Sequence, residues 1–321
     1  MPRALTPHQL ISMRRFEPQL REALKAENLS LAEDIMKKIQ SLFEGDRNHF
    51  RLLQAKNWYY EGVLEAGKLE DAKLGLEAVR KRAREGTRVF IEATALLAVC
   101  CLRLKKIDEA KKHLRFVIQN INSISSDRRR NQFQKRVIER IDEEFWIGQL
   151  VGRNEGVVSA KQIQEDAVKL LREKSPEQIF ELIGDAMPSN ALPLLKDVKD
   201  YAILLLPPPD QKLLEPPKQQ IPKAELGKKA LAAIKRIGWK AFCHQDSQIY
   251  KLWKNRIPKV FNEGYFAVAF TTVLAQWRIG LPQFGAGVVA IVMKYSCEEF
   301  CSTFKPEGLM IPRGENDAHE V

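Results

Sequence analysis

Apolar positions in the first third of the chain follow a repeating pattern with the spacing of amphipathic helices. Three segments, 29–32, 69–72 and 107–110, each carry an aliphatic residue, two further residues and an alanine. Large apolar residues follow each alanine at offsets of four and seven, so that they share one helical stripe with it. These residues are Met36 and Ile39, Leu76 and Val79, and Leu114 and Val117. The pattern predicts an amphipathic helix at each segment.

A further amphipathic stretch precedes the second and third segments, and a short polar break separates the two stretches. The breaks are Gly67-Lys68 and Lys105-Lys106. We therefore predict a unit of helix, tight turn and helix, in which the small alanine lets the two helices approach closely. The residues of the preceding stretches that we expect in the core are Trp58, Tyr59, Cys100 and Cys101.

This pattern resembles the tetratricopeptide repeat, whose second helix follows a Gly-containing turn and begins with an aromatic or aliphatic residue, two polar residues and alanine. The best matches are Gly67, Leu69, Ala72 and Leu76. The period here is 38–40 residues, whereas the family repeats every ~34. Tyr60 and Ala98 stand where the family has a glycine in its first helix, and its proline after the second helix is missing. The resemblance covers about residues 15–125.

The resemblance implies a solenoid whose concave surface is formed by the first helices and holds a peptide or a partner helix. Within these helices the candidate partner-binding residues are Lys56, Asn57, Tyr60, Glu61, Arg88 and Glu92. We give most weight to four of them: Lys56, Tyr60, Arg88 and Glu92. The alternative for each is an ordinary solvent-exposed side chain.

The rest of the chain divides into further predicted parts. The repeat domain closes with a helix at 126–152, and we place the whole domain at 1–152. Residues 153–206 read as capping helices, one of which begins with a capping box at Ser175. The proline-rich stretch 207–224 reads as a linker. A basic, hydrophobic helical domain follows at 225–308, and then a flexible tail at 309–321.

The predicted C-terminal domain combines basic, aromatic and apolar residues. A basic amphipathic helix at 226–242 precedes two apolar segments, 264–277 and 279–293, and the latter carries a Gly/Ala face suited to close helix packing. Three interpretations compete: a small helical domain with the apolar pair as its core, a module that acts on a membrane, and a nucleic-acid binder. The candidate residues for an anionic surface are Lys228, Lys229, Lys235, Arg236, Trp239, Lys240, Trp253 and Lys254.

Charge changes this picture through its uneven distribution. The chain of 321 residues has 52 Lys and Arg against 41 Asp and Glu, with 45% apolar and 29% charged residues, which is typical of a folded globular protein. Residues 101–140 have twelve basic and four acidic residues, including the cluster Arg128, Arg129 and Arg130, and residues 218–260 have eleven and two. Such runs indicate an anionic partner or, alternatively, solvated helix faces.

Five cysteines, Cys100, Cys101, Cys243, Cys297 and Cys301, are too few and too scattered for a secreted disulfide framework. Because the N-terminus also has no apolar leader, we expect a cytoplasmic protein, with association with a membrane as the alternative. The last three cysteines with His244 lack the spacing of a zinc site, so we predict no metal and expect buried thiols.

Catalytic motifs are missing: the sequence has no phosphate-binding glycine loop, nucleophile elbow or HExxH segment. We therefore predict no enzyme and no cofactor. The prediction is an all-α protein in which a TPR-like solenoid, a proline-rich linker and a small helical domain form an adaptor or scaffold for another protein. The alternatives are a membrane-perturbing effector of the defence or toxin type, controlled by the repeats, and a nucleic-acid-binding accessory protein.

Overall fold

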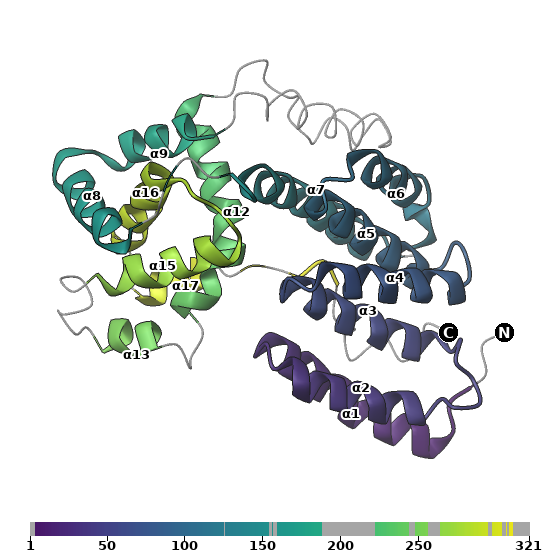
Figure 1. Ribbon diagram of the computed structural model, residues 1–321. Helices are drawn as coiled ribbons and strands as arrows, with labels where there is room; N and C mark the ends of the chain where they lie inside the picture. Colours follow the sequence, from purple (N-terminus) through teal and green to yellow (C-terminus); the bar gives the residue numbers. More distant parts are fainter. Residues whose placement is uncertain are drawn as a thin grey trace. The chain divides into compact units, whose positions relative to one another are not determined.

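The computed structural model describes residues 4–124, 126–153, 156, 159–187, 222–243, 248–255, 264–294, 297–303, 306 and 308–310 (Figure 1). Within these ranges the chain forms α-helices, one short 3-10 turn and no strand, which confirms the all-α prediction. The chain forms two compact units. The first contains the described residues up to Arg140 together with Gly308–Met310, and the second contains the described residues between Ile141 and Pro306.

Consecutive antiparallel helix pairs make up the first unit. They are α1 (Pro7–Lys25) with α2 (Leu29–Ser41), α3 (Phe50–Glu65) with α4 (Leu69–Arg82), and α5 (Arg88–Arg103) with α6 (Ile107–Gln119). The first helices also pack on one another, α1 on α3 and α3 on α5. A 3-10 turn (Ile121–Ser123) leads into α7 (Asp127–Leu150). The predicted hairpins are thus confirmed.

The repeated signature supplies the core of these pairs. Ala32, Ala72 and Ala110 are each 0% exposed, and the six large residues that follow them are all buried. Cys100 and Cys101 are buried thiols and Trp58 is buried, as expected, whereas Tyr59 is only partly buried. The pKa of Cys101 rises to about 11, chiefly because burial disfavours the thiolate. These cysteines therefore act as core residues.

The three hairpins share one turn. Glu27, Gly67 and Lys105 occupy equivalent positions after the first helix and have positive φ angles of 58°, 80° and 59°. In each case the next residue donates its backbone N–H to a carbonyl five residues earlier, as in Asn28 to Ala23 at 2.9 Å. This hydrogen bond is typical of a helix that ends in a left-handed residue, a position that favours glycine. Of the three turns, only the middle one has glycine at this position, at Gly67.

Tyr60, which stands where tetratricopeptide repeats have a glycine, fits because Gly75 on the facing helix α4 leaves room for its ring. A Cβ atom on Gly75 of α4 would lie 2.0 Å from Cε1 of the Tyr60 ring. The ring therefore needs glycine opposite it. Gly62, also on α3, is similarly close to Leu24 of α1, with 2.3 Å from a built Cβ to Cδ2. In this hairpin the small residue that makes room between the two helices lies on α4.

The second unit forms around α16. Its helices are α8 (Ala160–Glu173), α9 (Pro176–Asp185), α12 (Lys223–Cys243), α13 (Gln248–Lys254), α15 (Tyr265–Gln276), α16 (Pro282–Met293) and α17 (Cys297–Thr303). The first two, α8 and α9, pack on α16 and belong to this core, although we predicted them as capping helices of the repeat domain. The capping box at Ser175 is confirmed. Residues 188–206 of the predicted capping helices and residues 207–221 of the predicted linker lie outside the described residues.

Glycine residues allow the closest helix contacts in this unit. Between α9 and α12, a Cβ on Gly184 would lie 2.1 Å from the Lys223 carbonyl oxygen, and one on Gly227 would lie 1.9 Å from that of Phe180. On α16, a Cβ on Gly285 would come within 2.6 Å of Ile163 in α8. The Gly/Ala face expected to suit close packing therefore faces neighbouring helices, and the apolar segments supply the core.

No helix in the described ranges is both long enough and apolar enough to cross a membrane.

Candidate peptide-binding surface

Lys56 and Tyr60 lie one turn apart on α3, close to the second helix of the same hairpin. The Lys56 side chain is partly buried, and burial lowers its pKa, with further lowering by Arg82 and Arg47. Burial raises the pKa of Tyr60, while Arg82 lowers it. The two predicted residues thus share Arg82 as a neighbour, and this part of the surface is basic.

Arg88 and Glu92 form an ion pair on α5 that reaches into the core. The Arg88 Nε atom donates to Glu92 Oε1 at 2.8 Å, and Gln54 Nε2 of α3 donates to the other carboxylate oxygen, also at 2.8 Å. Glu92 is 0% exposed. We predicted a surface position for Glu92, and this prediction is wrong. Its carboxylate is buried and links α3 to α5 through the hydrogen bond from Gln54. Arg88 retains partial exposure.

Further polar contacts join the first helices. Arg51 of α3 donates through Nη2 to Glu17 of α1 at 2.6 Å. Asn57, another candidate, is fully buried and donates to the Val89 carbonyl of α5 at 3.0 Å. Buried polar groups with specific partners fix how neighbouring helices align, because a misaligned pair leaves a group unsatisfied. The layer of first helices is therefore held in register by side chains.

The most unusual contact of the first unit is at Glu61 of α3. Its carboxylate accepts the backbone N–H of Leu309 at 2.5 Å and that of Met310 at 3.4 Å to each oxygen. Leu309 is 1% exposed and Met310 is 5% exposed. We predicted a flexible tail from residue 309, but its first two residues are buried in the fold, and residues 311–321 lie outside the described ranges.

Charged groups surround this carboxylate. Glu65 follows one turn later on α3 and accepts hydrogen bonds from Arg140 of α7 and from Arg103 of α5, the latter at 3.5 Å. Arg103 also donates to the Leu64 carbonyl at 2.6 Å. Burial, followed by repulsion from Glu65, raises the pKa of Glu61 to about 7, although Arg140 and the two backbone N–H groups lower it. Glu61 therefore titrates near neutral pH.

The basic residues of α12 pair with acidic residues of the second unit. Lys228 lies 3.0 Å from Glu177 of α9. Arg236 is buried and lies 2.6 Å from Glu143 of α7, which also lies 3.6 Å from Lys235. These pairs neutralise part of the face that we predicted to bind an anionic surface.

The remaining candidates have varied surroundings. Lys229 lies 3.9 Å from Glu225 on its own helix. Trp239 donates its indole N–H to the Cys301 carbonyl at 3.1 Å, and the Lys254 ammonium lies 5.8 Å from the centre of the Tyr250 ring. The side chains of Lys240 and Trp253 lie outside what the structure describes.

The basic cluster at the start of α7 is partly occupied by local contacts. Arg130 pairs with Asp127 at 2.5 Å and donates to the Ile124 carbonyl at 3.3 Å. Arg128 is exposed, and Arg129 is partly buried. An anionic partner of this cluster stays a prediction.

Cys243 and Cys301 form a disulfide that joins α12 to α17, with their Cα atoms 5.4 Å apart. We expected buried thiols at both positions, so the structure corrects that prediction. The bond could not be predicted from local spacing, because 58 residues separate the two cysteines. Neither residue can supply a thiolate to a metal in this state, and the described residues contain no group of metal-ligating side chains.

Comparison of the chain with known protein families, curated proteins and solved structures gives no match.

Glu61 was among the candidates predicted from the sequence, but the residues that surround it were not. Arg103 and Arg140 look like ordinary members of a basic run, and Leu309 stands 248 residues from the carboxylate that accepts its N–H. A short apolar sequence near the end of a chain has no periodicity that would indicate docking. The only available signal was the pair of apolar residues after Gly308.

Proposed function

We propose that the protein is an adaptor, whose first unit binds another protein on a TPR-like layer of first helices. The observation that carries this proposal is the repeated hairpin: three antiparallel helix pairs with the same turn and the same buried alanine, whose first helices pack side by side. Stacked hairpins of this kind form extended surfaces that suit peptide or helix recognition.

Lys56 and Arg88 are the residues of this layer that best suit contact with a partner. Both are cationic and lie on neighbouring first helices, and Arg88 stays partly exposed although it pairs with Glu92. A partner with an acidic or polar segment fits this chemistry. The membrane-perturbing alternative receives less support, because α16 lies in a helical core and the α12 cations whose side chains the structure describes pair with acidic residues.

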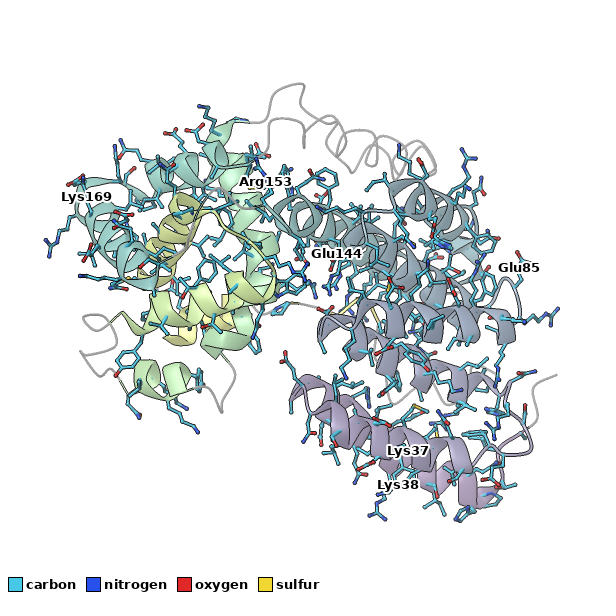
Figure 2. All side chains as sticks on the ribbon, in the orientation of Figure 1. Lys37, Lys38, Glu85, Glu144, Arg153 and Lys169 are labelled. Carbon is cyan, nitrogen blue, oxygen red and sulfur yellow. A yellow bond between two sulfur atoms is a disulfide. The ribbon has the colours of Figure 1, made fainter. Side chains whose placement is uncertain are left out.

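The proposal is tested by a photo-crosslinking amino acid placed in the full chain at Lys56. Matched control positions are Lys38 on α2 (Figure 2) and Leu74 on α4, which are both exposed and lie on second helices. We expect one discrete protein adduct from Lys56 that is absent from both controls. The same adducts from all three positions would speak against a dedicated binding face.

A further inference from the structure

The contact at Glu61 has the form of a bound peptide. Gly308, Leu309 and Met310 reach the first unit as an isolated stretch, since the described residues before them belong to the second unit. Two successive backbone N–H groups bind one carboxylate, and the two apolar side chains are buried. This combination of backbone capture and side-chain burial is how proteins recognise extended peptides.

The geometry sets conditions on the sequence of the bound segment. A Cβ at Gly308 would lie 3.3 Å from both carboxylate oxygens of Glu61, so a small residue fits best there. Proline is excluded at the two following positions because it has no N–H to donate. Both of these positions favour apolar side chains, because Leu309 and Met310 are buried. A suitable ligand is thus a glycine followed by two apolar residues with free amides.

We propose that the Glu61 site is the peptide-binding site of the first unit, that its ligand is an extended partner segment with a glycine and two apolar residues, and that Gly308–Met310 is an internal competitor. This inference rests on the proposed adaptor function and gives the partner an uncharged segment in addition to the acidic or polar one that suits Lys56 and Arg88. The competitor is part of the same chain, so it acts at an effective concentration on the order of millimolar. A partner must displace it, which makes binding conditional on release of the segment.

Surrounding charges make the site selective for backbone donors. Glu61 and Glu65 of α3 supply negative charge, while Arg140 of α7 and Arg103 of α5 are engaged with Glu65. An acidic side chain on the ligand would be repelled by Glu61, whereas N–H groups provide the positive ends of dipoles without the desolvation cost of a full charge. The site therefore favours uncharged residues at the positions of Leu309 and Met310.

The experiment measures binding of a fluorescent peptide with the sequence of residues 306–312 to the full chain by anisotropy. The competitor is removed by Leu309→Asp with Met310→Asp, or more mildly by Gly308→Val. We expect the opened variants to bind the peptide at least tenfold more tightly than the wild type. Circular dichroism checks their helix content, and the Gly308→Val variant decides the matter if the double variant unfolds.

Two further changes test whether the carboxylate is responsible. In an opened variant, Glu61→Ala should weaken binding at least tenfold, whereas Glu33→Ala on the exposed face of α2 should leave it unchanged. A peptide with an N-methyl group on the Leu309 amide keeps the side chains but loses one donor, and it should also bind at least tenfold more weakly. Equal binding of the methylated peptide, insensitivity to Glu61→Ala, or no binding to a folded opened variant overturns the inference.

The inference and the proposed function can fail separately. A specific adduct at Lys56 without peptide binding would leave the adaptor standing and remove the Glu61 site. Peptide binding at Glu61 without an adduct at Lys56 would support the Glu61 site and remove Lys56 from the partner-binding surface.

Discussion

Glu61 is a carboxyl group in surroundings that oppose its charge. Burial is the main cause, Glu65 adds to it, and the pKa rises from 4.5 to about 7. A group whose pKa is higher in the folded than in the unfolded chain takes up a proton on folding between these two pH values. The free energy of unfolding therefore falls as pH rises from about 4.5 to about 7, and it stays lower above that range.

We predict that Glu61→Gln removes this fall in the free energy of unfolding with rising pH. The neutral side chain keeps an oxygen for the Leu309 N–H and has no charge to desolvate, so the variant should be more stable than the wild type at pH 8, by roughly 1–3 kcal/mol. The difference should shrink towards pH 4.5. Chemical denaturation of both proteins at several pH values measures it.

Glu33→Gln is the control for this experiment. Glu33 is exposed on α2, and its pKa is lowered by the hydrogen bond from Lys37. Its loss should change stability little and in the opposite direction, because ionised Glu33 is the favoured form. If the wild type and Glu61→Gln have the same free energy of unfolding at every pH between 5 and 8, the raised pKa of Glu61 is contradicted.

At the scale of the helical hairpin, the left-handed turns are the clearest departure from local preference. A positive φ costs a residue with a side chain about 1 kcal/mol, because its Cβ comes too close to the backbone. Glycine has no Cβ and avoids this cost. Gly67 meets this demand, whereas Glu27 and Lys105 do not. Two of the three hairpins thus keep a strained end.

Glycine at the strained turns should stabilise the first unit. We expect Glu27→Gly and Lys105→Gly each to raise the free energy of unfolding by about 0.5–1 kcal/mol, and Gly67→Ala to lower it by about 1 kcal/mol. The control is Gly45→Ala, where φ is not positive and the added Cβ meets no atom within 4 Å. Urea denaturation compares the four variants, and similar effects at Gly45 and Gly67 would show that the turn is not the cause.

Elements of this kind could be predicted from sequence because their signals are local. The alanine and the apolar residues four and seven positions later lie on one helix, and all of them are buried. The partner against which a helix packs is harder to predict from the sequence. An apolar stripe on α8 or α9 shows that the helix packs on something, but not that the partner is α16. That choice depends on Gly285 and Gly287, more than 100 residues later in the chain.

Long-range pairing limits prediction in the same way at the candidate sites. The cations of α12 looked available for an anionic surface because Glu143, which binds Arg236, lies 93 residues earlier. Glu92 looked exposed because its partner Gln54 is on another helix. In both cases the charged residue was identified from the sequence, but its partner lies far away in the sequence and becomes visible only in the folded structure.

At the scale of the whole molecule, the disulfide should stabilise the second unit. It closes a segment of 58 residues between α12 and α17, and such a link disfavours the unfolded chain by about 2–4 kcal/mol. We predict that a reducing agent lowers the thermal midpoint of the wild type. The Cys243→Ser, Cys301→Ser double variant should start at the lower midpoint and show no response to reductant. An equal midpoint for wild type and variant under oxidising conditions would contradict a stabilising role.

The separation of Gly308–Met310 from Glu61 along the chain has a consequence for biosynthesis. The ribosome releases the helical hairpins long before it makes the segment that binds Glu61, which comes 248 residues later. At ~5–20 residues per second, that interval is on the order of 10–50 s. During this time the nascent first unit presents an unfilled carboxylate and uncovered apolar contacts to the cell. A partner or chaperone that meets the protein during translation therefore encounters no internal competitor, whereas one that arrives later does.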